Sequence, residues 1–201
     1  MSTIRHLNET SLWTSFQSGS EDALTELMRR YTRPLAFYGR KMARNDELIQ
    51  DCIQETFIQL WQYRANLRQI TEIRPYLFTC LRRKIIGSLK KEVFSEPVDD
   101  DLFSPFCIDF SIEERLIENE NEAYRVRVLN KLINSLSKKR KEVIYLKFYE
   151  NLSNNEIAEV MGIKYQTATN LIHEALDALR ELIPGQSIVS LLILWFSFTL
   201  P

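Results

Sequence analysis

Apolar side chains recur at helical spacing in two parts of the chain, and a stretch without any sustained period separates these parts. In residues 46–62 the positions that fall on one stripe are Ile49, Cys52, Ile53, Thr56, Phe57, Leu60 and Trp61. Positions three and four residues apart lie on one face of an α-helix. The pattern therefore predicts an amphipathic helix whose opposite face is polar.

Two further helices are predicted on either side of this one. Ser20 followed by two acids is typical of a helix start, because acids are favoured in the first turn, and the apolar positions that follow are Leu24, Leu27, Met28, Tyr31 and Leu35. Pro34 indicates a kink or a break in that helix. After a polar stretch at 62–71, Pro75 suits the first turn of a third helix that runs to about Lys91.

Residues 153–176 have the pattern of two short helices joined by a turn. Ser153 and Glu156 have the spacing of a capping box, and Gly162 suits the left-handed residue that ends a helix. Helical apolar spacing then resumes at Ala168, Leu171, Ile172, Ala175, Leu176 and Leu179. This layout is typical of a helix-turn-helix, whose second helix enters the major groove of DNA. A structural hairpin in an ordinary helical protein gives a similar pattern.

Composition and charge extend this picture to the whole chain. Five glycines and six prolines in 201 residues favour helices over a many-stranded fold. We therefore expect an all-α protein with two small helical domains joined by an acidic linker. Its expected parts are an N-terminal segment 1–19, a first domain 20–91, a linker 92–121, a second domain 122–183 and an apolar tail 184–201.

The charge is unevenly distributed between these parts. Residues 92–122 carry 11 acidic side chains and one basic side chain, whereas Lys and Arg outnumber the acids in both flanking blocks. Two basic blocks suit a polyanionic partner, although solvated helix faces give the same count.

Other classes of function find little support in the sequence. The three cysteines are far apart and the two histidines have no neighbouring ligands, so we expect buried free thiols and no metal site. No two glycines have the spacing of a phosphate-binding loop. We therefore expect no enzyme activity, no cofactor and no small-molecule substrate. The polar start of the chain has no signal peptide, which favours the cytoplasm.

The two patterned blocks resemble one protein family. Residues 51–61, DCIQETFIQLW, resemble the D-x-x-Q-E-x-F-x-x-x-W signature of sigma-70 family region 2. Residues 74–84, RPYLFTCLRRK, resemble the W-L-F-x-I-A-R-N segment that follows it in the extracytoplasmic function (ECF) subfamily. The second block is similar to region 4 of that subfamily, and its GIKYQT stretch is like that of Bacteroidota members. A LuxR-type regulator would share the helix-turn-helix but would not explain residues 51–61.

The resemblance implies a polymerase contact on the helix of residues 46–62. Asp51, Gln54 and Glu55 fall away from the apolar stripe, and a solvated face is the plain structural interpretation of such residues. By resemblance, they match positions that bind the clamp helices of the polymerase β′ subunit. Carboxylates suit a basic partner helix, since charge-assisted hydrogen bonds would fix its register.

The same resemblance implies that residues 62–84 read the −10 element of a promoter. A base that leaves the stack needs compensating stacking and hydrogen bonds, and nearby cations contact the phosphates. Tyr76 also fits a core position. The expected contact residues are Arg64, Asn66, Arg68, Arg74, Tyr76, Arg82, Arg83 and Lys84.

The second helix of the helix-turn-helix is expected to read the −35 element. It departs from the family wording T-V-K-S-R-L-H-R-A, because Thr169, Leu171 and Glu174 stand where Lys or Arg is common. Gln or Asn can read adenine bidentately, and phosphate contacts could instead come from Lys138–Lys141 and Lys147. The expected contact residues are Lys164, Tyr165, Gln166, Thr167, Thr169, Asn170 and His173.

The function implied by the resemblance is that of an ECF sigma factor that directs core enzyme to promoters and promotes transcription initiation. The implied partners are core RNA polymerase, through its β′ clamp helices and β flap, promoter DNA and an anti-sigma factor. Two alternatives remain open: a helix-turn-helix regulator that acts without core polymerase, and an inactive sigma-like protein that sequesters a partner.

The tail generates a prediction of its own. Residues 188–200 are almost all apolar, and as a helix they would span roughly 20 Å, short of the ~30 Å bilayer core. We expect the tail to fold back on the protein, with membrane attachment as the alternative. Removal of residues 186–201 should then increase protease cleavage near residues 93–112 without changing cell fractionation. Full-length chain in the membrane fraction, with truncated chain soluble, would contradict this expectation.

Overall fold

The computed structural model describes residues 7–67, 70, 72–92, 106 and 131–182. All regular structure in these ranges is helical, and the chain divides into two compact units, residues 1–103 and 104–201. An all-α fold is therefore confirmed. Apart from residues 92 and 106, the expected linker lies outside the described residues, as does the expected tail.

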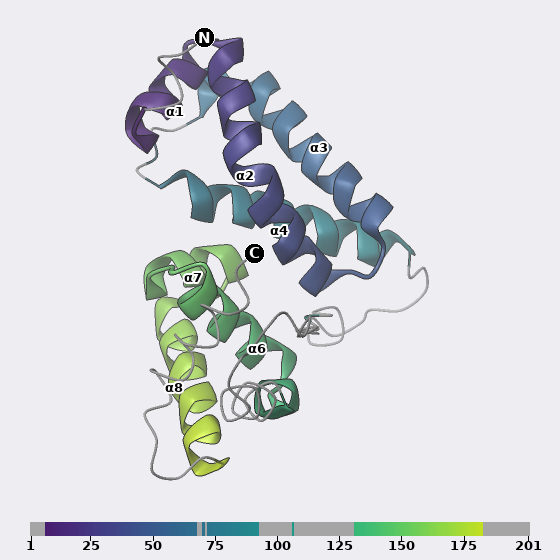
Figure 1. The fold of residues 1–201 in the computed structure, drawn as a ribbon, viewed down its shortest axis with the longest axis vertical. Coiled ribbons are helices and arrows are strands. Elements are labelled where there is room, and N and C mark those ends of the chain that lie inside the picture. Colours follow the sequence, from purple (N-terminus) through teal and green to yellow (C-terminus); the bar gives the residue numbers. More distant parts are fainter. Residues whose placement is uncertain (1–6, 68–69, 71, 93–105, 107–130, 183–201) are drawn as a thin grey trace, which may run out of the picture. The chain divides into compact units, whose positions relative to one another are not determined.

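In its described residues, the first unit has four α-helices and one short 3-10 turn. Each of the first three helices begins at a side-chain cap, at Asn8, Ser20 and Asn45, whose oxygens accept backbone N–H groups of the first turn. Figure 1 shows α2 and α3 side by side with α4 crossing them. The elements are α1 (Glu9–Gln17), α2 (Glu21–Met42), α3 (Asp46–Tyr63), η2 (Arg64–Asn66) and α4 (Ile73–Glu92).

A kink or a break is expected at Pro34, and the break is wrong, because α2 continues through this residue as one helix of 22 residues. Proline removes one backbone hydrogen bond and crowds the preceding turn. Burial compensates for this loss, since Tyr31, Leu35 and Tyr38 on both sides of Pro34 are at most 3% exposed. The ring of Tyr38 packs in a tilted arrangement against that of Phe78 in α4, with 4.9 Å between ring centroids, so packing against α4 keeps the helix intact.

Helix α1 is an element that the sequence analysis did not predict. Its apolar residues Leu12, Trp13 and Phe16 are fully buried, and the helix packs against α2. A nine-residue helix with only three apolar positions gives a weak periodic signal. The N-terminal segment therefore contributes two large aromatic side chains to the core of the first unit.

Helix α2 has a close approach to α3 at Gly39 and a buried carboxylate at Glu26. Gly39 allows α2 to approach α3, because a Cβ atom at this position would lie 2.7 Å from Cγ2 of Ile49. Glu26 is buried in α2 and accepts hydrogen bonds from Arg29 at 2.7 and 2.8 Å and from Arg30 at 2.6 Å. The bond from Arg29 is the main cause that lowers the pKa of Glu26 to about 2. The ionised Glu26 carboxylate therefore stabilises the fold at pH values above the usual carboxyl pKa, and this stabilisation is lost as the pH falls through about 2.

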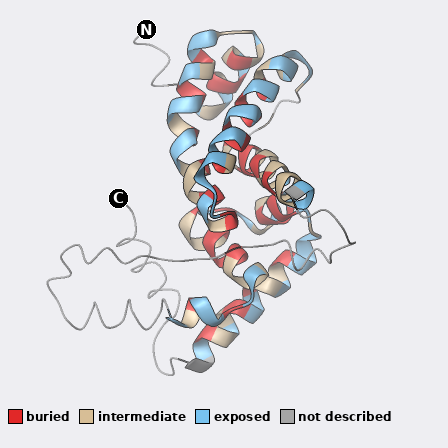
Figure 2. Cartoon of the chain, turned by 90° about the vertical axis from the view of Figure 1, so that its right-hand side faces the viewer, coloured by how far each residue is buried: buried red, intermediate tan, exposed pale blue. Residues whose placement is uncertain are grey.

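The second unit has the helix-turn-helix that the sequence predicts. Ser153 and Glu156 form a capping box, and Gly162 ends α7 in the left-handed conformation with φ 67°. Helical residues 131–135 precede the named elements, and Figure 2 shows that buried residues gather along one side of the helices. The elements are α6 (Lys138–Ile144), the π-helical turn η3 (Tyr145–Tyr149), α7 (Asn154–Met161) and α8 (Tyr165–Leu182).

The π-helical turn forms an aromatic centre in the second unit. Tyr145 stacks on Tyr149 with ring centroids 4.7 Å apart, and its hydroxyl donates to Oε1 of the buried Glu150 at 2.9 Å. Phe106 lies edge-on to Tyr145 at 5.7 Å and is 1% exposed. One residue of the expected linker therefore belongs to the core of the second unit.

The carboxylate of Glu9 joins three helices of the first unit, and this generates a stability prediction. One oxygen accepts from the hydroxyl of Tyr31 in α2, and the other accepts from the N–H of Ile73 at the start of α4, at 3.1 Å. Burial, together with the Glu9 hydrogen bond, raises the pKa of Tyr31. Glu9→Ala should lower the free energy of unfolding by about 1–3 kcal/mol, because it leaves two part-buried donors without this acceptor.

The measurement is urea unfolding combined with hydrogen exchange of the Ile73 amide, which should become faster in this variant. The matched control is Glu21→Ala, which removes an exposed first-turn acid from α2 and should cost at most about 1 kcal/mol. Equal losses from the two substitutions, with unchanged exchange at Ile73, would contradict the role assigned to Glu9.

Candidate functional site

The predicted polymerase-contact residues lie on the exposed side of α3. Asp51, Gln54 and Glu55 are all exposed, whereas Ile49, Ile53 and Phe57 on the opposite side are buried. At about 100° per residue, Asp51, Gln54 and Glu55 lie within one sector of the helix. The structure therefore brings these three side chains together on a surface that is open to a partner.

An apolar residue within this sector was missed by the sequence analysis. Ile58 is 54% exposed, and it follows Gln54 and Glu55 by four and three positions, so it lies beside both on the helix surface. Its position outside the buried stripe was the available signal. A single exposed apolar side chain is ordinary on a protein surface, but here it lies among the predicted polymerase contacts and adds apolar area to them.

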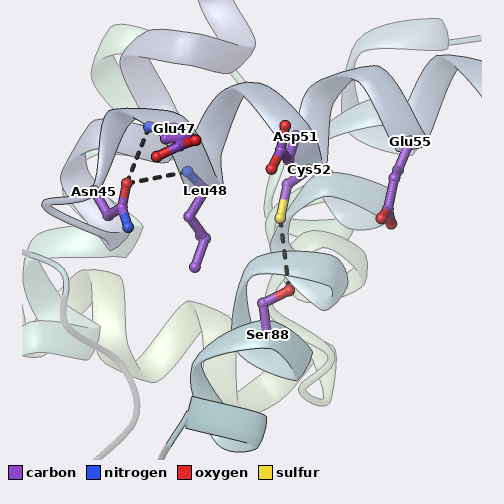
Figure 3. Close-up of a pocket in the computed structure, with 7 residues that line it drawn as sticks. All are labelled: Asn45, Glu47, Leu48, Asp51, Cys52, Glu55 and Ser88. Carbon is purple, nitrogen blue, oxygen red and sulfur yellow. Dashed lines mark hydrogen bonds between the residues drawn. The ribbon is translucent and has the colours of Figure 1, made fainter.

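The acids of this surface border a shallow depression between α3 and α4. Figure 3 shows Glu47, Asp51 and Glu55 following one another along α3, with Ser88 of α4 opposite Cys52. The depression has a volume of about 310 Å³. At its base, Sγ of Cys52 and Oγ of Ser88 are 3.8 Å apart. Three carboxylates around an open depression favour a cationic partner over an anionic one.

An ion pair connects the predicted polymerase surface with a predicted DNA contact. Nζ of Lys84 in α4 lies 3.1 Å from Oε2 of Glu55. The Lys84 side chain is 15% exposed and that of Glu55 is 66% exposed, so the lysine is the more enclosed partner. In this state Lys84 is directed toward α3 and is paired with a carboxylate.

The loop after α3 uses one of its predicted DNA contacts internally. The guanidinium of Arg64 lies 4.1 Å from the ring centroid of Trp61, and its Nη1 donates to the Trp61 carbonyl at 2.6 Å. Asn66 at the end of η2 is exposed. Arg68 lies outside the described residues. Of the two predicted −10 contacts in this loop that the structure describes, Asn66 is therefore the one left open to a base.

Helix α1 supports this loop at both of its ends. At the first end, Nε2 of Gln17 donates to the Leu67 carbonyl at 2.7 Å. At the second end, Trp13 lies edge-on to Tyr76 with ring centroids 5.8 Å apart, and Glu9 accepts from the Ile73 N–H. These contacts were not predicted, because they join residues 50 or more positions apart in the sequence.

The remaining predicted −10 contacts lie on different sides of α4. Tyr76 is half-buried and Arg83, seven positions later, is exposed on the same side of the helix. Arg74 and Arg82 are half-buried. Arg82 and Lys84 are two positions apart and thus point roughly 200° apart around the helix. The cations of α4 therefore do not form one continuous patch.

The thiols near these surfaces are unreactive in character. Burial is the main cause that raises the pKa of both Cys52 and Cys80, so both thiols stay protonated near neutral pH. Burial also raises the pKa of Tyr76 to about 12. Among the residues that the structure describes, no group of three or more candidate metal ligands occurs.

The start of α8 presents most of the predicted −35 contacts to solvent. Thr169 differs from the others, because it is half-buried and its hydroxyl accepts from Nδ2 of Asn154 at 3.3 Å. Asn154 also accepts from Nζ of Lys147 at 3.0 Å, which ties this expected phosphate contact to α7. The exposed residues are Lys164, Tyr165, Gln166, Thr167, Asn170 and His173.

Two acids of α8 are paired with arginines. Oε2 of Glu174 accepts from Nη2 of Arg140 in α6 at 2.7 Å, and Asp177 accepts from Arg180 at 2.7 Å. Glu174 stands where the family wording has a cation, so the pairing with Arg140 offsets a negative charge beside the predicted DNA surface. All four side chains are partly or largely exposed, so each pair contributes little to stability.

Two family models match the chain. The model of sigma-70 region 2 matches residues 27–94, and the model of sigma-70 region 4 matches residues 127–179. Together they cover more than half of the chain. The first match contains α3 and α4, and the second contains the helix-turn-helix.

Known proteins are similar to the chain over most of its length. The RNA polymerase sigma factor SigZ of Bacillus subtilis is 24% identical over 162 residues, which is 81% of this chain and 88% of SigZ. The ECF RNA polymerase sigma factor SigL of Mycobacterium tuberculosis is 26% identical over 170 residues, covering 81% of this chain and 92% of SigL. Because these relatives come from Bacillus and Mycobacterium, the likeness to Bacteroidota members stays a prediction.

A solved structure has the same fold. The sigma factor RpoE of Bartonella quintana, in its complex with the anti-sigma factor NepR, superposes with a TM-score of 0.56 at 19% identity. The match covers 84% of this chain and 100% of that chain. Within the described ranges of the present structure, none of the helices is both long enough and apolar enough to cross a membrane.

The internal contacts of Arg64 generate a prediction that separates it from Asn66. Arg64→Ala removes a cation–π contact and a hydrogen bond, and should lower the free energy of unfolding by about 1–2 kcal/mol. Asn66→Ala should change it by less than about 0.5 kcal/mol, since the side chain is exposed. Thermal unfolding of the two variants measures this difference. If both variants unfold like the unaltered chain, Arg64 has no structural role in the loop.

Proposed function

The chain belongs to the sigma-70 family of RNA polymerase sigma factors, in its ECF subfamily, and from this premise we propose that it directs core RNA polymerase to promoters. It acts as an initiation factor, and the polymerase carries out the chemistry. The first unit binds core enzyme and the −10 element, and the second unit binds the −35 element. We place this work in the cytoplasm, where the polymerase and the DNA are found.

The observation that carries the proposal is the exposed side of α3. Asp51, Gln54 and Glu55 surround Ile58 there. A basic helix of the β′ clamp would place its cations against the two carboxylates and its apolar atoms against Ile58. The charges would set the register and the rate of association, and burial of Ile58 would contribute the apolar part of the affinity.

The work on DNA is divided between the two units. In the first, Asn66 and Arg83 are the exposed candidates for the melted −10 strand, and Tyr76 is held by Trp13 at the edge of the loop. In the second, the start of α8 enters the major groove at the −35 element. The β flap of the polymerase is the protein partner that we assign to the second unit.

An anti-sigma factor is the regulator that we propose for this chain. The basis is the similar fold of RpoE, which was solved with the anti-sigma factor NepR bound. A partner that covers the exposed side of α3 would compete directly with the polymerase clamp.

The prediction that tests the proposal is a charge reversal on α3. Asp51→Arg together with Glu55→Arg should weaken binding to core polymerase by at least about 100-fold, which is roughly 2.7 kcal/mol. Helicity by circular dichroism should be unchanged, because both side chains are exposed. The measurement is the affinity of labelled full-length chain for core enzyme.

A matched control reverses two other exposed acids, with Glu21→Arg and Asp22→Arg at the start of α2. It changes the net charge by the same amount and should bind core enzyme with nearly unaltered affinity. Equal affinities of the α3 variant and the control for core enzyme would contradict the assignment of α3 as the polymerase-binding surface. Absence of core binding by the unaltered chain would instead favour a helix-turn-helix regulator that acts alone.

A further inference from the structure

Two amide side chains are paired on the outer face of the recognition helix α8. Gln166 and Asn170 are four positions apart and both are exposed. Nε2 of Gln166 donates to Oδ1 of Asn170 at 3.0 Å. Ala168, midway between them, is fully buried, so the two amides point roughly 200° away from the buried side of the helix. They therefore occupy the part of α8 that would face into a DNA groove.

The hydrogen bond couples the orientations of the two amides. With Nε2 of Gln166 donating to Oδ1 of Asn170, one N–H of Nε2 is used, and Oε1 and the second N–H are left for a partner. Rotation of the Gln166 amide alone by 180° would place Oε1 against Oδ1, and two acceptors do not bond, so a hydrogen bond is kept only if both amides turn over and Nδ2 of Asn170 donates to Oε1. Asn170 thus opposes rotation of Gln166 on its own and favours the orientation that offers an acceptor and a donor side by side.

The presented pair matches the major-groove edge of one base. Adenine offers the N6 amino group as a donor beside the N7 acceptor, whereas guanine offers two acceptors, O6 and N7. Oε1 of Gln166 can accept from N6–H while Nε2–H donates to N7. Against guanine, Oε1 would meet O6 and one buried contact would be repulsive.

We propose that Gln166 reads an adenine in the −35 element and that Asn170 is a positioning residue that orients its amide. The inference rests on the proposed function of the second unit as a −35 reader. It goes further by naming the base and the residue that selects it.

The surroundings of the pair are consistent with recognition by hydrogen bonds instead of charge. Residues 165–173 contain no Lys, Arg, Asp or Glu. The hydroxyl of Thr169 accepts a hydrogen bond from Asn154, and Glu174 forms an ion pair with Arg140. Cations outside this stretch, such as the exposed Lys164, would therefore make the phosphate contacts. Salt should therefore lower the total affinity much more than it lowers the preference for adenine.

The test uses holoenzyme formed from the full-length chain and core polymerase, with a promoter library randomised upstream of the −10 element. The unaltered chain should enrich sequences with one adenine position, preferred over guanine by about 10- to 100-fold. Gln166→Arg should shift the preference at that position to guanine, because Arg pairs with O6 and N7. Asn134→Arg is the control, since it adds the same charge at an exposed position of the helical residues 131–135, outside the predicted −35 contacts, and should leave the adenine in place.

Two further variants test the role of Asn170. Asn170→Ala should reduce the adenine preference at least about threefold, because the amide of Gln166 is no longer held. Asn170→Asp keeps an acceptor at the same place, so it should retain the preference even though its charge weakens total binding. A merely structural role for Asn170 would not give this difference in base preference, because the residue is exposed.

The outcomes separate the inference from the function on which it rests. If the unaltered holoenzyme enriches a defined upstream sequence that Gln166→Arg leaves unchanged, the inference is overturned and the proposed function stands. If the unaltered chain enriches no upstream sequence, both fail. Enrichment of adenine that moves to guanine in the Gln166→Arg variant alone supports the assignment.

Discussion

A helix that buries one stripe must present the opposite stripe to solvent, and both predicted binding surfaces depend on this constraint. In α3, burial of Ile49, Ile53 and Phe57 fixes the outward direction of Asp51 and Glu55. In α8, burial of Ala168 and Ile172 fixes the outward direction of the amides of Gln166 and Asn170. The apolar core therefore sets the orientation of the side chains that we predict to bind partners, although these side chains contribute almost nothing to its stability.

Helix α1 contacts both ends of the segment that we assign to the −10 element. Gln17 holds its start, Trp13 packs on Tyr76 at its end, and Glu9 accepts from the first N–H of α4. A loop fixed at both ends loses less conformational entropy when it binds a base. The N-terminal segment thus supports the proposed −10 binding site, although its own residues need not touch DNA.

The sequence predicted the elements whose signals are local. The stripe of α3, the capping box at Ser153 and the left-handed Gly162 all follow from residues within a few positions, and all are confirmed. The break at Pro34 was wrong because tertiary packing outweighs one lost hydrogen bond. The sequence also could not show which predicted contact residues are exposed to a partner and which are paired within the protein. The internal partners of Arg64, Lys84 and Thr169 follow only from the folded geometry. Which of the predicted contacts touch polymerase or DNA stays a prediction.

The central claim is that this chain and core polymerase together open promoter DNA. Permanganate reactivity of thymines across the −10 region of a cognate promoter measures that opening directly. We expect reactive thymines only when the full-length chain and core enzyme are both present. Unreactive thymines in the complete mixture, despite binding to core enzyme, would indicate an inactive sigma-like protein and contradict the account. Equal reactivity with the chain alone would contradict it as well, because the opening would then not require the polymerase.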